Sequence, residues 1–262
     1  MSEETKSLRD RIQSFAEQIG EVAILSKNTF GSIFQRPLEI ESTVYQMESL
    51  GLRSLAIVAV TSIFIGMVMT IQFAWGLRRF GGLEYIPRVV ALSFVRELGP
   101  TLTAVIVGGR IGSGMAAEVG AMNVTEQVDA IRALGADPVK KLVLPRVAAA
   151  MMAMPLLSMF ATALGITGAM IVCSLQFGIG RDYFFTSALD TLQLTDFITG
   201  MAKTPIFGFI IAIVGCHFGL KTTGGTEGVG LSTTRSVVVV STAILVADFL
   251  LTKCFIIAGI DS

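Results

Sequence analysis

Six ionisable side chains lie within segments that are otherwise apolar. They are Arg96, Glu97, Arg110, Glu118, Lys203 and Asp248. An uncompensated charge at the centre of a bilayer costs between roughly 2.5 and well over 10 kcal/mol, so such residues normally face other protein groups or a watery cavity. The chemistry open to them is therefore ion pairing between helices, contact with a charged substrate, or proton transfer.

Four of these residues are expected to meet in the outer leaflet. Arg96 and Glu97 precede residues 99–100, a Gly-Pro pair where we expect the backbone to break, while Lys203 and Asp248 lie in two later apolar segments. From the residues alone, this cluster is either a set of salt bridges that fixes helix packing or a substrate contact. Glu97 with Lys203 or Asp248 also suits a proton pathway, which supports an ion-coupled secondary transporter as the alternative function.

Arg110 and Glu118 accompany a ridge of small residues at four-residue steps. The ridge consists of Gly108, Gly112, Ala116 and Gly120. Small residues at this spacing let another helix approach closely, so we expect this helix to be buried in a bundle. Arg110 and Glu118 lie about two turns apart, and we expect them to pair with other helices, with a transport role as the alternative.

The elements that must position these residues are membrane helices. Of the 262 residues, 52% are hydrophobic and only 15% are charged. This composition predicts an all-α integral membrane protein, and the formal net charge of zero gives no indication of nucleic-acid binding. We predict five spanning helices, at about 52–75, 100–122, 147–180, 197–217 and 236–257. We expect residues 219–234 to form an inner loop and residues 181–196 a short outer connection.

An amphipathic helix is expected before the first span. Its apolar side chains recur at steps of four and three: Leu8, Ile12, Phe15, Ile19 and Val22. We expect residues 1–51 to be cytoplasmic or interfacial, with this helix lying in the membrane interface, although packing on a soluble partner would give the same pattern. Lysine and arginine residues gather in the N-terminal tail and in two of the loops, which predicts a cytoplasmic N-terminus.

A short helix is expected between the second and third spans, at about 124–134. Asn123 suits its N-cap together with Glu126, and Gly135 suits its C-terminal stop. One apolar stripe contains Val124, Val128, Ile131 and Leu134. At about 1.5 Å per residue the helix is too short to cross a membrane. It suits docking into a soluble partner, although packing on its own bundle would show the same stripe.

The first span continues into a stripe that suits acyl chains. Met69, Phe73, Leu77 and Phe80 follow one another at steps of four, four and three. The stripe is equally consistent with ordinary helix packing.

Five motifs carry a family resemblance. They are IFIGMVM (residues 63–69), RELGP (96–100), GGRIGSGMAAEVGAM (108–122), TEQVDAIRALGADPVKKLVLPR (125–146) and TTRSVV (233–238). Together they resemble the MlaE/YrbE permease family of Mce-type phospholipid ABC transporters. The resemblance covers nearly the whole chain from about residue 40.

The resemblance implies a homodimeric permease of the bacterial inner membrane, with residues 52–262 as the permease domain. It implies transfer of phospholipid between that membrane and a periplasmic MCE-domain hexamer of the MlaD type. ATP and Mg would bind a separate cytoplasmic ATPase of the MlaF type, accompanied in many systems by a STAS-domain protein of the MlaB type.

The resemblance also implies roles for named residues. The ATPase-coupling residues would be Glu126, Gln127, Val128, Asp129, Ile131, Arg132 and Leu134. The outer polar cluster would lie near the lipid cavity, where the headgroup would meet Arg96, Glu97, Lys203 and Asp248.

Missing motifs weigh against catalytic functions. No GxxxxGK[ST] loop occurs, so ATP hydrolysis by that route is excluded, and we expect a non-catalytic subunit without a cofactor. An enzyme acting on lipid would be expected to carry a motif such as HExxH or GxSxG, and neither is present. The two halves of the chain also lack the obvious internal repeat of many secondary transporters.

Overall fold

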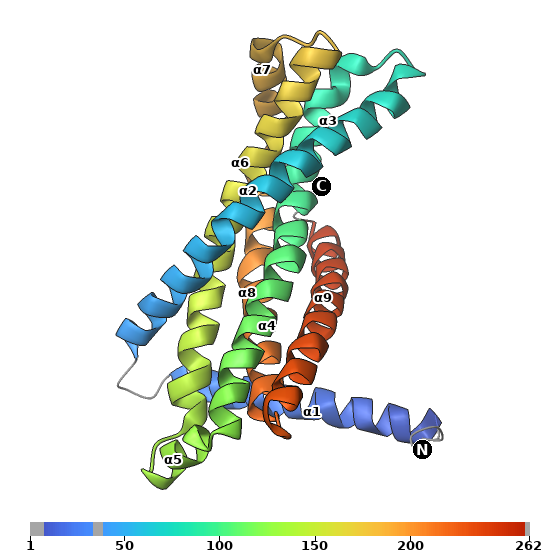
Figure 1. Cartoon of the computed structure of the whole chain (residues 1–262). Coiled ribbons are helices and arrows are strands. Elements are labelled where there is room, and N and C mark those ends of the chain that lie inside the picture. The colour runs from blue at the N-terminus through green and yellow to red at the C-terminus, as the bar shows by residue number, and fades with distance from the viewer. Residues whose placement is uncertain (1–7, 34–38, 260–262) are drawn as a thin grey trace.

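The computed structural model describes residues 8–33 and 39–259, and within these ranges the chain is helical without a strand (Figure 1). The main helices are α1 (Leu8–Ile33), α2 (Ile40–Arg78), α3 (Ile86–Ser93), α4 (Thr103–Val124), α5 (Gln127–Ala133), α6 (Leu144–Gln176), α7 (Arg181–Thr191), α8 (Leu194–Leu220) and α9 (Gly225–Ile257). Three short segments join them: the 3₁₀ turn η1 (Leu83–Tyr85) and the π-helical segments η2 (Phe94–Leu102) and η3 (Val139–Val143).

Five continuous helical segments among the described residues are long and apolar enough to cross a membrane. They are Ile40–Arg78, Leu83–Val124, Val139–Gln176, Leu194–Leu220 and Gly225–Ile257. The prediction of an all-α membrane protein with five spans is confirmed. Most of the helices extend beyond the predicted spans because more polar residues continue them at their ends. In particular, α2 begins at Ile40 and passes position 51 without a break. The third spanning helix ends at Gln176, before the predicted end at position 180, and Gly178 beyond it has a left-handed φ of 66°.

Two examples show how closely the helices of the bundle pack. The first is between α2 and α6, where Gly66 faces the backbone of Gly165 and Gly168 faces the backbone of Ile63. The second is the ridge on α4, which is buried between α8 and α9. Gly108 contacts Ile211 and Ile244, and Gly112 contacts Val240. Contacts this close favour glycine because a side chain would hold the two backbones apart.

The expected break at residues 99–100 is wrong. The chain instead passes through Pro100 in the π-helical segment η2, which joins α3 to α4 without interruption. Proline lacks an N–H and clashes with the carbonyl four residues earlier, and a wider turn accommodates both defects. Gly99 lies against the side chain of Thr162 on α6, so the neighbouring helix supports the widened turn.

Two expected loops are also largely helical. In the first, α8 ends at Leu220 and α9 already begins at Gly225, so only a short turn remains of the predicted inner loop. The turn is possible because Gly224 has a φ of 87°, a left-handed conformation that suits glycine. In the second, the predicted outer connection contains α7.

The short inner helix forms as α5, but it begins at Gln127 and its N-terminal capping differs from the prediction. Val124, predicted on its apolar stripe, is the last residue of α4. Asn123 lies inside α4, where its Nδ2 donates a hydrogen bond of 3.0 Å to the carbonyl oxygen of Thr222. Glu126 takes a left-handed φ of 60° and precedes α5. Gly135 ends the helix as predicted, since its N–H donates to Arg132 and that of Ala136 donates to Ile131.

Helix α1 crosses the end of the bundle where α5 also lies (Figure 1). The structure describes only part of the predicted apolar stripe, because the side chains of Leu8, Ile12 and Phe15 are not among those that it describes. Farther along, Leu25 is buried, and Phe30 stacks on Phe209 of α8 with ring centroids 5.0 Å apart. Glu21 accepts a hydrogen bond from Lys221, and this bond lowers the pKa of the Glu21 carboxyl.

Candidate functional site

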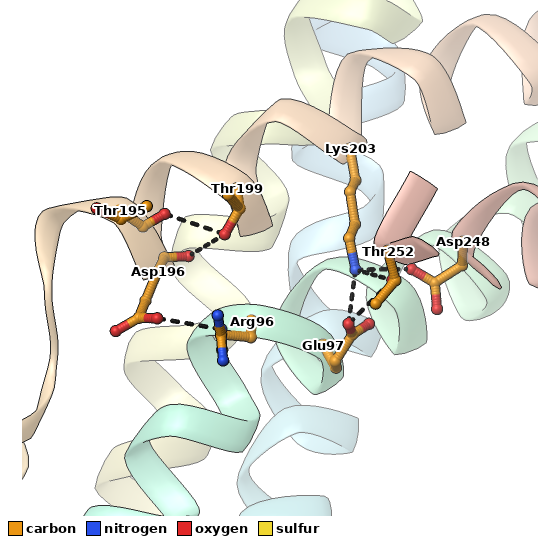
Figure 2. Close-up of polar contacts among 8 residues, drawn as sticks. All are labelled: Arg96, Glu97, Thr195, Asp196, Thr199, Lys203, Asp248 and Thr252. Carbon is orange, nitrogen blue, oxygen red and sulfur yellow. Dashed lines mark hydrogen bonds and ion pairs between the residues drawn. The ribbon is translucent and has the colours of Figure 1, made fainter. Parts of the chain in front are cut away.

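A buried lysine joins three helical segments in the half of the bundle away from α5 (Figure 2). Lys203 of α8 donates hydrogen bonds from Nζ to Glu97 Oε1 of η2 at 2.7 Å and to Asp248 Oδ1 of α9 at 3.1 Å. A third bond of 2.7 Å reaches Thr252 Oγ1. The Thr252 hydroxyl in turn donates to Glu97 Oε1 at 3.1 Å. We call Glu97, Lys203, Asp248 and Thr252 the Lys203 cluster.

The charged side chains of the Lys203 cluster differ in their exposure to solvent. The Lys203 side chain is only 2% exposed and uses all three of its donors, whereas Glu97 is 40% exposed and Asp248 is 18% exposed. Two carboxylates face one ammonium group, so the cluster carries a formal charge of −1. The exposed Glu97 carboxylate gives the cluster an open, negatively charged side.

A second ion pair lies beside the Lys203 cluster (Figure 2). Arg96 Nε is 3.0 Å from Asp196 Oδ1, and the Arg96 side chain is 30% exposed. The other carboxylate oxygen of Asp196 accepts a bond of 2.9 Å from the backbone N–H of Gln193. Asp196 therefore caps α8 and holds Arg96 in place at the same time.

The π-helical segment η2 explains why the adjacent residues Arg96 and Glu97 both point toward α8. In a regular α-helix, adjacent side chains diverge by about 100°. A π-helical turn contains more residues, so neighbours diverge less. Both side chains can therefore reach partners on α8, Arg96 at Asp196 and Glu97 at Lys203.

The structure brings together all four predicted residues of the outer group and adds Asp196 and Thr252. Sequence reasoning missed both additions, although spacing offered a signal. Asp196 lies seven residues before Lys203, and Thr252 lies four residues after Asp248, so each shares a helix face with a predicted residue.

The predicted acyl-chain stripe is divided between two environments. Phe73 and Leu77 are partly buried and pack against an apolar cluster that includes Phe94 and Phe184. Met69 is also half-buried, whereas Phe80 lies just beyond α2 and is 86% exposed. Contact of these residues with lipid remains a prediction.

Arg110 and Glu118 are bonded to other helices and not to each other. Arg110 Nη1 donates a hydrogen bond of 2.8 Å to Ser54 Oγ of α2. Glu118 Oε2 accepts one of 3.2 Å from Nη2 of Arg146, a nearly buried residue of α6 that the sequence reasoning did not single out. Arg146 Nη1 also donates to the carbonyl oxygen of Leu142 at 2.9 Å, which ties α4 to the segment that follows α5.

Most predicted coupling residues are exposed on α5 or directly at its two ends. Val128 is buried and Ile131 is half-buried, so these two side chains anchor the helix. The exposed residues are Glu126, Gln127, Asp129, Arg132 and Leu134. Leu134 is 86% exposed, so the apolar stripe is only partly turned toward the bundle. The outer face of α5 is therefore charged, with one large apolar side chain at its end.

Comparison with known proteins gives consistent matches along the chain. Residues 43–254 match the family described as Permease MlaE. A probable ABC transporter permease protein of Synechocystis sp. is 42% identical over 227 residues, which cover 87% of this chain and 86% of that protein. One of Rickettsia typhi is 40% identical over 239 residues, covering 91% and 92%. Protein TRIGALACTOSYLDIACYLGLYCEROL 1, chloroplastic, of Arabidopsis thaliana is 39% identical over 241 residues, covering 92% and 69%.

Proposed function

The chain belongs to the MlaE permease family, and from this premise we propose that its cargo is phospholipid. It is a multi-pass membrane permease of the ABC transporter class, which implies a separate ATPase subunit. We further propose that it works as a non-catalytic homodimer in a bacterial inner membrane, with its N-terminus in the cytoplasm. It would exchange phospholipid with a periplasmic MCE-domain hexamer of the MlaD type.

The observation that carries the lipid proposal is the pairing of unlike charges in an apolar bundle. Arg96 and Glu97 are both partly exposed, although each is bonded to α8. A phosphodiester could contact the Arg96 guanidinium, and a headgroup amine could contact the Glu97 carboxylate. A permease for apolar cargo would not require such charges. One relative, the Arabidopsis protein, also bears the name of a diacylglycerol glycolipid.

The proposal assigns the energy input to α5. Its exposed residues Glu126, Asp129 and Leu134 would contact the ATPase, while ATP and Mg would bind that subunit and no cofactor would bind this chain. The ATPase would be of the MlaF type, with a STAS-domain protein of the MlaB type beside it. In the homodimer, a second copy could cover the exposed apolar face of α9 at Val238, Leu245 and Phe249.

The test is lipid transfer by the complex reconstituted with its ATPase in phospholipid vesicles. Asp248→Asn removes one carboxylate charge but leaves Lys203 bonded to Glu97 and Thr252. We expect this variant to assemble with the ATPase and to transfer lipid more slowly. The matched control is Lys253→Ala, which removes an exposed charge from the same end of α9. We expect this control to transfer lipid at the parent rate.

Two results would contradict the proposed function. If the Asp248→Asn variant transferred lipid at the parent rate, the Lys203 cluster would have no part in lipid transfer. Uptake driven by a proton gradient, with no ATPase present, would instead support the ion-coupled secondary transporter.

A further inference from the structure

A polar cleft lies toward the α5 end of the molecule, away from the Lys203 cluster. It has a volume of about 500 Å³ and lies between α2, α4 and the start of α9. Its polar lining includes Gln46, Ser49, Arg53, Arg110, Ser113 and Glu118. This volume falls within the range of roughly 300 to 1,000 Å³ that is usual for small-ligand pockets.

Helical spacing explains why these side chains share one cleft. Gln46, Ser49 and Arg53 recur at steps of three and four on α2, so they lie on one face. Helix α2 packs mainly along α6, which leaves this face beside α4 uncovered. On α4 the wall contains Gly114, where an added Cβ would meet no heavy atom within 4 Å. The space is therefore open at the backbone of α4.

The cleft carries more positive than negative charge. Arg110 is oriented by its hydrogen bond to Ser54, which is buried. Arg53 is exposed and makes no hydrogen bond or ion pair within the part of the chain that the structure describes. Glu118 is the acidic residue of the lining, and its charge is offset by Arg146. Two guanidinium groups in a small cleft favour an anion, and phosphate suits their planar donor geometry.

An apolar path leads away from the cleft along α2. Ile57, Val60 and Phe64 follow Arg53 at steps of four, three and four, so they continue the same face. All three are exposed, by 39%, 58% and 61%. A ligand with a phosphate at Arg53 and a hydrocarbon chain along this stripe would satisfy both parts of the surface. A free anion would use only the first part.

We propose that this cleft binds the phosphate of a phospholipid from the cytoplasmic leaflet, with an acyl chain along Ile57, Val60 and Phe64. The proposal rests on the proposed transport of phospholipid and adds a site distinct from the Lys203 cluster. Glu118 joins the cleft to Arg146 and Leu142, next to the segment that follows α5. A headgroup in the cleft would therefore lie one ion pair away from the base of the ATPase-docking region.

Photocrosslinking of the full chain tests this site. A photoreactive amino acid replaces Ser113, and the protein is reconstituted in vesicles of phosphatidylethanolamine and phosphatidylglycerol that contain a radiolabelled phosphatidylglycerol. We expect the label to become attached to the protein. Arg53→Gln should reduce the attached label about tenfold, which corresponds to about 1.4 kcal/mol, because the phosphate would lose its charge-assisted hydrogen bonds to Arg53. Arg235→Gln, which removes an exposed arginine outside the cleft, should leave it unchanged.

A second variant tests whether a loss of labelling results from misfolding and not from loss of the binding site. Arg110→Gln should also reduce labelling at Ser113, and the parent, Arg53→Gln and Arg110→Gln proteins should show the same elution volume in detergent. Excess inorganic phosphate should leave the labelling unchanged, because a free anion lacks the contacts with the apolar stripe. Competition by inorganic phosphate would overturn the lipid assignment.

Three further outcomes separate this inference from the proposed function. If the parent and Arg53→Gln proteins were labelled equally, the label would come from the surrounding bilayer lipid, and the proposed binding site would be overturned. Crosslinks between two copies of the chain, without lipid, would show that a second protomer covers the cleft and would also overturn it. If Asp248→Asn slows lipid transfer while the parent and Arg53→Gln proteins are labelled equally at Ser113, only the cleft assignment fails.

Discussion

At the scale of single residues, the Lys203 cluster joins three helical segments, and under the proposed function it would also contact the lipid headgroup. A buried ammonium group must have partners, and Lys203 has three in Glu97, Asp248 and Thr252. Removing one partner of a buried ion pair typically costs about 3–5 kcal/mol, whereas replacing all the charges together is often nearly neutral. This asymmetry provides a way to separate packing from transport.

We therefore predict that Lys203→Met alone lowers the thermal unfolding temperature of the detergent-solubilised protein, because Glu97 and Asp248 are left facing each other. Combining Lys203→Met with Glu97→Gln and Asp248→Asn should restore most of the lost stability but should not restore lipid transfer. The measurements are a melting curve and a vesicle transfer assay on each variant. Restored transfer in the triple variant would show that the charges serve packing only.

At the scale of elements, the α2–α6 contact depends on backbone proximity. Gly66 lies against the Gly165 carbonyl group, so no side chain fits between the helices at this level. The π-helical segment η2 similarly depends on its neighbour, since Gly99 meets Thr162 of α6. Small residues at these crossings thus determine where α2 and η2 lie, and with them the positions of Arg96 and Glu97.

A matched pair of glycines on α2 tests this dependence. Gly66→Ala should destabilise the protein, because the new methyl group would overlap the backbone of α6. Gly76→Ala lies on the same helix with no heavy atom within 4 Å of the added Cβ, and it should stabilise by about 0.5–1 kcal/mol through helix propensity. Melting temperatures of the two variants should shift in opposite directions. A shift in the same direction would contradict the close-packed crossing.

At the scale of the whole molecule, the two ends of the bundle differ in their chemistry. The C-terminal part of α9 contributes Asp248 and Thr252 to the Lys203 cluster. The end of the bundle away from the C-terminus of α9 presents α5 and the crossing helix α1 (Figure 1). The α4 helix connects these regions, since it continues from η2 and leads to α5. Arg110 and Glu118 fasten it to α2 and α6 along the way. A displacement of α5 by a bound ATPase would thus act on the helix that leads directly to Arg96 and Glu97.

Charge reversal on α5 tests this assembly. The double variant Glu126→Lys and Asp129→Lys should lose co-purification with the ATPase, because both side chains are exposed on the proposed docking face. Buried Val128 is untouched, so the helix itself should persist. Glu227→Lys reverses an exposed charge at the start of α9 and serves as the control. If the double variant still co-purified with the ATPase in full, the ATPase would bind a surface other than α5.

The sequence by itself determined the five spanning helices, the short helix before Gly135, and the ionisable residues that need shelter. Each of these follows from a local property: an apolar run, a left-handed glycine, or a charge within hydrocarbon. Only the tertiary structure decided that residues 99–100 widen the helix instead of breaking it. It alone also assigned Asp196, Thr252 and Arg146 as partners. Lys203 and Glu97 are 106 positions apart, and such contacts depend on how whole helices pack.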